Sequence, residues 1–508
     1  MAIEPDFAAF ARAYEGGHGQ AVHTRLVADL ETPVSAFLKL GVGRDNAFLF
    51  ESVQGGESRG RYSIIGLKPD LIWRCRNGRA QINRRARSEP DAFEADALAG
   101  DPLQSLRALL AQTRMLLPAR LPPMAVGVFG YLGYDMVRLI ENLGPPPPDP
   151  LDLPDAVLLR PTITAIFDNV RDEIIVVTPV RPEEGLDARA AYARACERLT
   201  DTVADLERPA PAMPVAVEAL GSGAEVQSNT THDEYLAIVE RAKEYIRAGD
   251  VFQVVPSQRF RRPFALPPFS LYRALRRLNP SPFLYHLAFP DFSIVGSSPE
   301  ILVRLRDGKV TIRPIAGTRR RGATTEEDVA LGEELMADPK ERAEHLMLLD
   351  LGRNDVGRVA KTGTVRVTAS FFIERYSHVM HLVSNVEGAL RGGLDCIDAL
   401  AAGLPAGTLS GAPKIRAMQL IDEFEKEKRG AVYAGAVGYF AADGSMDTCI
   451  VLRTALVKDG TMYVQAGGGV VADSDPEAEY QESVNKAKAL MAAADEAMRM
   501  ASAARKGQ

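Results

Sequence analysis

Short runs rich in apolar and β-branched residues recur in pairs along the chain. Five segments contain two such runs each: 61–82, 162–180, 300–318, 436–457 and 456–469. The runs are joined by Asn77-Gly78, by residues 169–172, or by an Asp-Gly pair. Such runs predict β-strands, and Asn-Gly or Asp-Gly between two strands predicts a tight hairpin.

Helical periodicity marks three longer segments, at 231–250, 328–355 and 476–500. Asp-Pro at 338–339 and again at 475–476 is a helix start, because Asp caps the first turn and Pro fits the first helical position. Hairpins outnumber strand-helix-strand units. The pattern therefore predicts an α+β fold with antiparallel sheets.

Two segments rich in Pro and Gly interrupt these patterns, at 144–154 and 208–225, and the second has the composition of a linker. A chain of 508 residues suits one large domain or two interlocked ones. We predict an N-terminal domain over 25–205 and a C-terminal domain over 226–495.

Composition narrows the class of protein. With 46% hydrophobic and 25% charged residues the chain is globular, and its net charge of −7 argues against a nucleic acid partner. No apolar run is long enough for a membrane span and no signal peptide opens the chain, so we expect no membrane partner and a cytoplasmic location. The four cysteines are scattered, which indicates buried thiols in a reducing compartment.

The two Asp-Pro helix starts share a second feature. Glu341 and Glu344 stand three residues apart in the first helix, and Glu479 and Glu482 do so in the second. Such neighbours on one helix face repel each other unless a cation or a proton intervenes. Glu341 also fits a capping box with Asp338, and Glu479 also suits the helix dipole, so spacing alone leaves both interpretations open.

A larger set of motifs covers residues 25 to 495. It comprises FLFESV, RYSIIG, GDVFQVVPSQRF, NPSPFLYHL, GSSPEILV, RPIAGTRRRG, EHLMLLDLGRNDVGRV, HVMHLVSNVEG, PAGTLSGAPKIRAM, GAVGYF, DTCIVLRTA and VQAGGGVV. Together they resemble anthranilate synthase component I, of the chorismate-utilising enzymes. The resemblance implies stacked antiparallel β-sheets flanked by helices, with tryptophan-binding elements in the N-terminal domain and chorismate in the C-terminal one.

The resemblance implies that the two glutamate pairs face each other and hold one Mg²⁺. Glu344 and Glu482 would be direct ligands, and Glu341 and Glu479 would support them or bind through water. Such a cation is typically held by one or two carboxylates together with an anionic substrate, here chorismate.

The resemblance also implies a substrate site. Lys486 would lie near the ring carboxylate, although spacing alone reads it as a surface partner of Glu482. Gly467, Gly468 and Gly469 would close around a carboxylate with their backbone amides, although a tight turn explains them equally well. The remaining expected contacts are Arg453 and Tyr433 for the enolpyruvyl carboxylate, with Gly317, Thr318 and Thr408 in the wall. We also expect Arg453 to lie within an alternating strand.

The expected reaction adds ammonia at C2 of chorismate while the 4-hydroxyl leaves, and then eliminates pyruvate. By resemblance Glu300 would protonate the leaving hydroxyl, and His381, which we expect to titrate near neutral pH, would handle protons in the elimination. His378 lies three residues from His381 and is easily confused with it. A solvated carboxylate and a structural histidine are the simpler interpretations of these residues taken singly.

Two positions select among the relatives. Enzymes that add water carry a lysine where this chain has Gln253, and aminodeoxychorismate synthases carry a lysine where it has Ala316. Both differences favour ammonia as the nucleophile and anthranilate as the product. The alternatives are aminodeoxychorismate synthase component I and a catalytically silent tryptophan-binding relative.

No cysteine stands in a glutaminase motif, so the chain needs free ammonia or a separate glutamine amidotransferase subunit. The resemblance further implies feedback inhibition by tryptophan. Glu51 and Ser52 would bind the polar end of that ligand, and the segment Pro280, Ser281 and Pro282 would shape its pocket, although these are also ordinary loop and turn residues.

Overall fold

The computed structural model describes residues 2–54, 58–96, 101–211, 225–376, 379–430 and 432–505. Most of the predicted linker, and His378, lie outside these ranges. All strand pairs are antiparallel, and the five predicted hairpins form with the predicted turns. Asn77 and Gly78 both have positive φ, at 51° and 67°, as a two-residue hairpin turn of this type requires.

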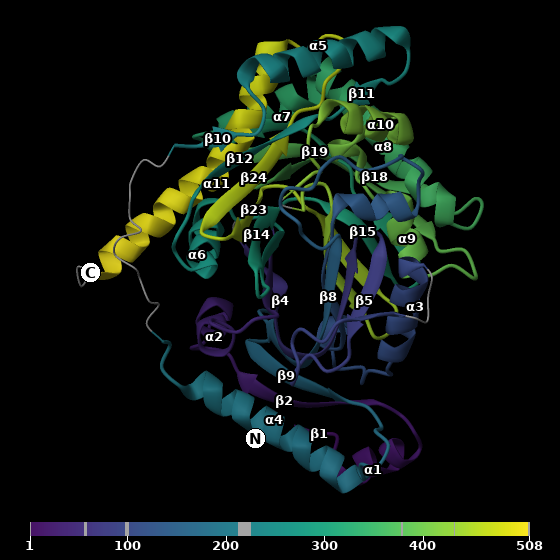
Figure 1. Cartoon of the computed structure of the whole chain (residues 1–508), viewed down its shortest axis with the longest axis vertical. Helices are drawn as coiled ribbons and strands as arrows, with labels where there is room; N and C mark the ends of the chain where they lie inside the picture. The colour runs from purple at the N-terminus through teal and green to yellow at the C-terminus, as the bar shows by residue number, and fades with distance from the viewer. Residues whose placement is uncertain are drawn as a thin grey trace.

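Apart from the short pair of β11 (Gln253–Val254) and β20 (Gly411–Ala412), the strands build two stacked sheets in the middle of the molecule (Figure 1). In the first sheet the order is β10 (Gln227–Ser228), β12 (Ser257–Pro263), β24 (Thr461–Gly467), β23 (Thr454–Lys458), β14 (Phe292–Ser298), β13 (Phe283–Ala288), β3 (Ala47–Gln54), β4 (Ser58–Arg76), β8 (Ala156–Asp168), β9 (Glu173–Val180), β2 (Gln20–Val27) and β1 (Ile3–Glu4).

The second sheet shares β4 and β8 with the first. Its order is β6 (Glu94–Ala95), β5 (Arg79–Asn83), β4, β8, β7 (Gly127–Leu132), β21 (Ala436–Ala441), β22 (Met446–Ile450), β15 (Ile301–Arg306), β16 (Lys309–Ile312) and β19 (Val379–Ala389), with β17 (Ile315–Arg320) and β18 (Arg366–Arg375) also on β19. The register of β4 on β8 shifts between Pro69 and Leu71, where both strands pass from one sheet to the other.

Side chains alternate between two environments along these strands. Phe48 of β3 and Phe129 of β7 meet in the layer between the sheets, with ring centroids 4.7 Å apart. Their neighbours Leu49 and Val128 turn outward into separate cores beneath the helices. Because successive side chains of a strand point to opposite faces, both faces of β3 and β7 are buried.

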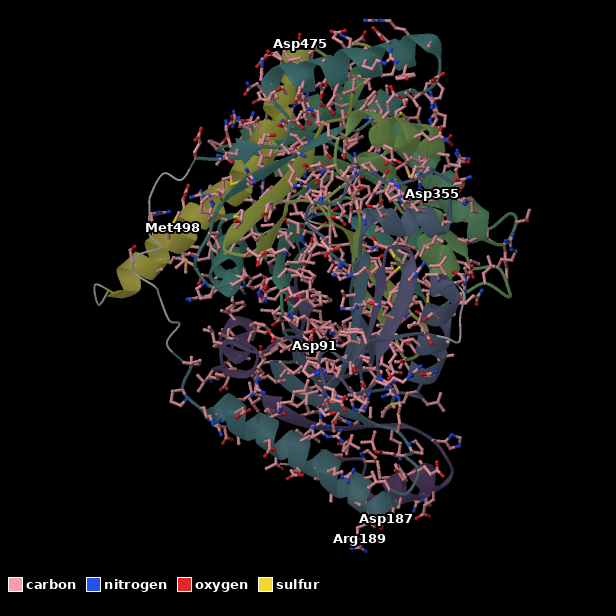
Figure 2. The ribbon with its side chains drawn as sticks, in the orientation of Figure 1. Asp91, Asp187, Arg189, Asp355, Asp475 and Met498 are labelled. Atoms are coloured by element: carbon pink, nitrogen blue, oxygen red, sulfur yellow. The ribbon has the colours of Figure 1, made fainter. Side chains whose placement is uncertain are left out.

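Helices cover both outer faces, so the predicted class of stacked antiparallel sheets flanked by helices is confirmed. They are α1 (Phe7–Glu15), α2 (Pro33–Leu40), α3 (Pro102–Thr113), α4 (Ala188–Glu207), α5 (His232–Ala248), α6 (Pro268–Leu278), α7 (Thr325–Ala337), α8 (Pro339–Val359), α9 (Cys396–Gly403), α10 (Lys414–Phe424) and α11 (Pro476–Arg505). Helix α11 runs from Asp475, beside α5, towards Met498 near the C-terminus (Figure 2). Within the described ranges no helix combines the length and apolar character needed to cross a membrane.

The predicted helical segment 328–355 is two helices, because Asp338 ends α7 and caps α8. Its side chain accepts hydrogen bonds from the amides of Lys340 and Glu341, and Pro339 occupies the first helical position. The local chemistry of Asp-Pro therefore sets the direction in which α8 leaves the sheet and where its first turn lies.

The two predicted domains share their sheets. Strand β3, from the N-terminal part, pairs with β13, and β7 pairs with β21, both from the C-terminal part. The chain thus behaves as one interlocked α+β unit whose N-terminal segment contributes strands to both layers.

Candidate functional site

A cavity of 570 Å³ lies between the first turns of α8 and α11 and the edges of both sheets. We call it the carboxylate cavity. The structure brings together in its lining the predicted residues Gln253, Glu300, Gly317, Thr318, Glu341, Glu344, His381, Thr408, Tyr433, Arg453, Gly467, Gly469, Glu479, Glu482 and Lys486. They come from segments more than 200 residues apart, so the fold gathers what the sequence scatters.

Two neighbouring connections between the sheets supply Glu300 and Arg453. The chain passes from β14 to β15 through Pro299 and Glu300, and from β22 to β23 through residues 451–453. Backbone hydrogen bonds fasten the two connections together: the Ser297 amide donates to the Arg453 carbonyl at 3.1 Å, and the Ile450 amide to the Glu300 carbonyl at 3.0 Å. Both side chains thus lie at the same edge of the stack.

Glu300 is an acid held in its neutral form. Glu300 is 6% exposed, and burial raises its pKa to about 8. Hydrogen bonds from Ile315 and Thr408 and the charge of Arg453 lower the pKa, but by less. The Thr408 hydroxyl lies 3.5 Å from one carboxyl oxygen. A carboxylic acid with a pKa near neutrality can give up a proton to a leaving group.

Arg453 does not lie within a strand, so that expectation is wrong. It stands in the connection after β22, with a positive φ of 49° that non-glycine residues seldom adopt. Burial lowers the pKa of its guanidinium, and among the described residues no carboxylate forms an ion pair with it. A partly buried guanidinium without a protein counter-ion fits an anionic ligand, since removing an unpaired charge from water is costly.

His381 is a neutral base rather than a group that titrates near pH 7. Its Nδ1 lies 3.0 Å from the carbonyl oxygen of Gly317, which can only accept, so Nδ1 carries the proton. Its Nε2 is buried without a partner, and burial lowers the pKa of the ring to about 4. The expectation of titration near neutral pH fails because it ignored burial. His381 offers the cavity a fixed lone pair.

The four predicted metal carboxylates differ in how they are held. Glu341 accepts a hydrogen bond from Arg319 at 3.1 Å, and Glu482 pairs with Lys486 at 2.7 Å. Burial, and then the charges of Glu341 and Glu482, raise the pKa of Glu344. Burial, and then Glu482, raise the pKa of Glu479, whose Oε2 is buried without a partner. Two of the four acids therefore carry little compensating positive charge.

This arrangement fits a cation that takes part of its shell from elsewhere. Within the described residues, no three His, Cys, Asp or Glu side chains converge closely enough to hold a metal ion by themselves. Mg²⁺ requires less, because it retains waters and binds one or two carboxylates plus a substrate anion. Mutually repelling acids with an unsatisfied buried oxygen are the residues such an ion would stabilise.

The glycine run is required by close packing rather than by turn geometry. None of Gly467, Gly468 and Gly469 has a positive φ. A Cβ on Gly468 would stand 2.6 Å from Oε2 of Glu479, and one on Gly469 would stand 2.4 Å from Nε2 of Gln253. Side chains here would fill the wall between α11 and Gln253. Lys486 adds a cation to this wall, because its Nζ donates to the Gly467 carbonyl at 3.0 Å.

Sequence reasoning missed three residues of the site. Lys340 and Gln465 line the carboxylate cavity. Buried Tyr376 stands behind it, with its ring against that of His381. Lys340 follows the Asp-Pro helix start and was identifiable as a cation next to Glu341; no local signal distinguishes the other two.

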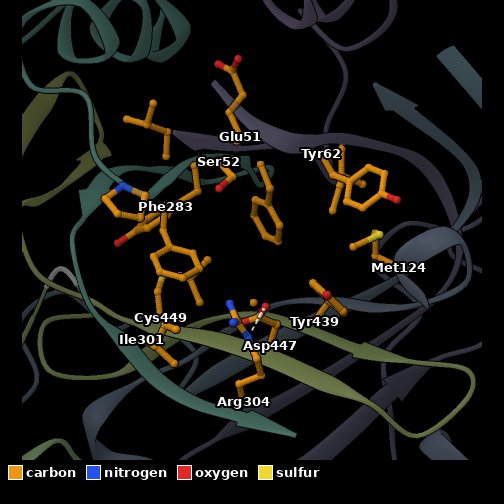
Figure 3. A pocket seen from close by; sticks show the side chains of 18 of the residues that line it. Glu51, Ser52, Tyr62, Met124, Phe283, Ile301, Arg304, Tyr439, Asp447 and Cys449 are labelled. Carbon is orange, nitrogen blue, oxygen red and sulfur yellow. Dashed lines mark hydrogen bonds and ion pairs between the residues drawn. The ribbon is translucent and has the colours of Figure 1, made fainter. Parts of the chain in front are cut away.

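A second cavity of 390 Å³ lies between the two sheets, and we call it the inter-sheet cavity. Of the residues predicted to bind tryptophan, Glu51, Ser52 and Pro282 line it, whereas Pro280 and Ser281 lie just before β13. The Glu51 carboxylate points away from the space faced by Tyr439 and Asp447 (Figure 3). Arg276 holds it at 2.7 Å, and the Tyr272 hydroxyl also donates to it. The expected use of Glu51 at the polar end of a ligand does not agree with this direction.

A family described as chorismate binding enzyme matches residues 48–492. The chain therefore belongs to the chorismate-binding enzyme family.

Relatives narrow the comparison to anthranilate synthase component 1. A protein of that name from Cereibacter sphaeroides is 62% identical over 491 residues, covering 97% of each chain. Another from Aquifex aeolicus is 48% identical over 93% of this chain and 94% of its own. The crystal structure of anthranilate synthase component I from Streptococcus pneumoniae is 36% identical, with a TM-score of 0.74, covering 92% of this chain and 99% of that one. The resemblance inferred from the motifs is confirmed.

A more distant structure shares the fold alone. The menaquinone-specific isochorismate synthase from Escherichia coli is 20% identical, with a TM-score of 0.69 over 96% of this chain and 100% of that one. The stacked sheets are thus common to enzymes of different product, so the product has to be argued from the site.

Proposed function

We propose that this chain is the chorismate-converting component of an anthranilate synthase, a lyase that makes anthranilate and pyruvate from chorismate and ammonia. The observation that carries the proposal is the pairing of neutral Glu300 with the unpaired Arg453 on adjacent connections, in a cavity that also exposes Gln253 and Ala316. The anionic substrate would satisfy the guanidinium, and the acid would stand where a hydroxyl leaves.

Substrate binding follows from the positive charges of the cavity. Arg453 and Tyr433, which both line the cavity, would bind the enolpyruvyl carboxylate, Arg453 in a bidentate manner. Lys486 and the backbone of residues 467–469 would bind the ring carboxylate. Thr408, Gly317 and Thr318 would close the space between them. The two carboxylates of one ligand would then span the cavity and orient its ring.

The proton transfers follow from the state of each side chain. Glu300 gives its proton to the 4-oxygen as the C4–O bond breaks, so hydroxide leaves as water while ammonia forms a bond at C2. His381, with a lone pair on Nε2, is the acceptor suited to the proton that leaves C2 when the C3–O bond breaks and enolpyruvate departs. Gln253 has no basic nitrogen, which suits ammonia because that nucleophile needs no deprotonation before it attacks.

The glutamates would hold Mg²⁺ together with the substrate. Glu344 and Glu482 are proposed as ligands, with Glu341 and Glu479 supporting them. When bound, the ion would supply Lewis-acid charge stabilisation and help orient the ring carboxylate. The chain's own contribution is to bring two acidic helix starts to one wall of the cavity.

The ammonia would come from a separate glutamine amidotransferase subunit. A glutaminase needs an activated thiolate, yet burial raises the pKa of the Cys75 and Cys396 thiols to about 12 and raises those of Cys196 and Cys449 as well. These are all four cysteines of the chain. Their inertness supports a partner that releases ammonia from glutamine.

Tryptophan would be the feedback inhibitor and would bind in the inter-sheet cavity. The enzyme would work in the cytoplasm. Phe50, Tyr62, Phe283 and Tyr439 give that cavity an aromatic lining suited to an indole ring. Ser52 and Pro282 would contribute from β3 and from the start of β13.

The proposed function is tested by incubating the purified chain with chorismate, Mg²⁺ and a nitrogen donor. We expect anthranilate fluorescence with ammonium and none with glutamine alone. Consumption of glutamine by the isolated chain would overturn the two-subunit proposal, and a lack of product with ammonium would overturn the activity.

A further inference from the structure

The two cavities are separated by a thin partition. Pro299 and Ile315 line both of them. Between and beside these two residues the side chains alternate: Glu300 faces the carboxylate cavity, whereas Ile301 and Arg313 face the inter-sheet cavity. The residues that separate the cavities are therefore the sequence neighbours of a catalytic acid.

The partition also contacts His381. It includes residues 313–317, and the carbonyl of Gly317 accepts the hydrogen bond that fixes the tautomer of His381. The Glu300 carboxylate in turn accepts a hydrogen bond from the amide of Ile315. A shift of this segment would move the acid and the base together.

Tyr376 links the inter-sheet cavity to the same histidine from behind. It is 5% exposed, and its ring meets that of His381 edge on, with centroids 5.5 Å apart and planes 61° apart. The pKa of its hydroxyl is raised by burial and then by the nearby carboxylate of Glu374, and the hydroxyl also lies near the guanidinium of Arg453. Glu374 accepts in turn from Arg313 at 3.1 Å, and both of these charged residues line the inter-sheet cavity.

The backbone of Tyr376 is fixed at the end of the β18 to β19 hairpin. Its amide donates to the Val379 carbonyl at 2.8 Å, and its own carbonyl accepts from Arg321 at 2.6 Å. With the backbone held at both ends, the side chain contacts the His381 ring and has Glu374 and Arg453 as charged neighbours.

We propose that Tyr376 is a positioning residue for His381, and that the contacts from Arg313 through Glu374 to Tyr376 couple occupancy of the inter-sheet cavity to the catalytic base. The inference rests on the proposed function. It concerns how the carboxylate cavity and the inter-sheet cavity are linked, and Tyr376 lines neither of them.

The charges on this path explain why an amino acid would disturb it. Arg313 and Glu374 satisfy each other, and each is only half-buried. A zwitterion in the cavity brings a carboxylate that competes for Arg313 and an ammonium group that competes for Glu374. The Glu374 carboxylate near the Tyr376 hydroxyl is then drawn away or shared, and the ring can move against His381. A ligand acts on the far site only through such a difference between two arrangements.

The test separates binding from coupling. Tyr376→Phe keeps the ring and removes the hydroxyl, whereas Tyr376→Leu removes the ring contact with His381. Tryptophan affinity is measured by calorimetry with Mg²⁺, with and without chorismate, and with ammonium absent. Coupling factors between two sites are typically about 5–150-fold. We expect Tyr376→Phe to bind tryptophan within about twofold of the wild type while the coupling factor falls towards one.

Tyr376→Leu should lower kcat at least about tenfold and change KM for chorismate by a smaller factor, because it displaces a group of the chemical step while Arg453 and the other binding groups remain. The matched control is Tyr245→Phe, which removes another tyrosine hydroxyl next to a glutamate, on the surface of α5. It should change neither quantity. Tyr376→Phe serves as the folding control for the leucine variant.

Three results would overturn the proposal. An unchanged coupling factor in Tyr376→Phe would show that the hydroxyl does not transmit the effect. A loss of tryptophan affinity as large as the loss of coupling would make Tyr376 part of the tryptophan site. A wild type whose chorismate and tryptophan sites are uncoupled would leave nothing to transmit. Failure of the proposed function shows separately, as a wild type that makes no anthranilate in the same buffer.

Discussion

Glu300 and Arg453 stand on two antiparallel connections that carry the chain between the stacked sheets, and two backbone hydrogen bonds tie these connections together. Each side chain alters the other: the charge of Arg453 lowers the pKa of Glu300, and Glu300 raises that of Arg453, although burial dominates both. The pair places a proton donor next to an anion-binding group without forming an ion pair. If Glu300 were ionised and paired with Arg453, it could not donate a proton and Arg453 could not bind an anion. Burial prevents this because it keeps Glu300 protonated.

Replacing Glu300 should remove the proton donor. We expect Glu300→Gln to lower kcat by about 10²–10⁴-fold, the usual range for general acid catalysis. In the wild type, kcat/KM at fixed free ammonia should fall as the pH rises through about 8, where the acid ionises. Steady-state kinetics between pH 6 and 10 measures this fall.

The same substitution should also change how stability depends on pH. Because the folded pKa of Glu300 is raised above its ordinary value of 4.5, its contribution to stability is complete below that value and is lost as the pH rises through about 8. Denaturant unfolding of Glu300→Gln should show a smaller loss between pH 5 and 8 than the wild type. A pH profile of activity that is unaffected by the substitution would remove Glu300 from the chemistry.

His381 should behave as a base that is neutral at working pH. Burial lowers its folded pKa to about 4, so its contribution to stability is present above its ordinary value of 6.5 and is lost as the pH falls towards 4. His381→Gln should flatten that part of the unfolding profile and lower kcat by at least about tenfold. An NMR titration that places His381 near pH 6.5 would contradict the structure.

The carboxylates should differ in their response to loss of charge. We expect Glu344→Gln and Glu482→Gln to nearly abolish turnover while the fold survives, because each removes charge from a cation shell rather than from the core. Glu341→Gln should be milder, since Arg319 already compensates that group. The matched control is Glu334→Gln, an exposed partner of the same arginine, which should leave activity unchanged.

Metal removal gives the complementary measurement. EDTA should stop turnover and Mg²⁺ should restore it, and Mg²⁺ with chorismate should raise the melting temperature of the wild type but not of Glu344→Gln. Full activity in the presence of a chelator would exclude a metal from this enzyme.

Ser52→Phe should fill part of the inter-sheet cavity and block its ligand. The variant should still make anthranilate but require far more tryptophan for inhibition, with tryptophan affinity lowered in calorimetry. The control Ser88→Phe adds the same ring to an exposed position and should remain sensitive. Unchanged tryptophan affinity in Ser52→Phe would place the inhibitor elsewhere.

Local chemistry made much of the fold predictable. The hairpins follow from pairs such as Asp307-Gly308, whose positive φ values of 51° and 68° suit Asp and Gly but few other residues. The start of α8 follows from Asp338-Pro339 in the same way. These signals depend on a few adjacent residues and hardly on the rest of the chain.

Features set by distant contacts were not predictable. Arg453 reads as part of an alternating run, but the chain changes sheets there and breaks the strand. His381 was assigned an ordinary pKa because nothing in its neighbourhood along the chain reveals burial. The direction of Glu51 depends on Arg276 and Tyr272, more than 200 residues away. Alternation within β3 could have warned that Glu51 and Ser52 face opposite ways.

The most direct test of the account is to separate the products formed from chorismate and ¹⁵N-labelled ammonium with Mg²⁺ by chromatography and to identify each by mass and NMR. We expect anthranilate that carries one ¹⁵N atom, together with an equal amount of pyruvate, and almost no product from Glu300→Gln. A labelled amine with its nitrogen at C4 that still carries the enolpyruvyl group, with no pyruvate released, would make the chain an aminodeoxychorismate synthase component. Unlabelled isochorismate would show that water is the nucleophile, and either product would contradict the assignment.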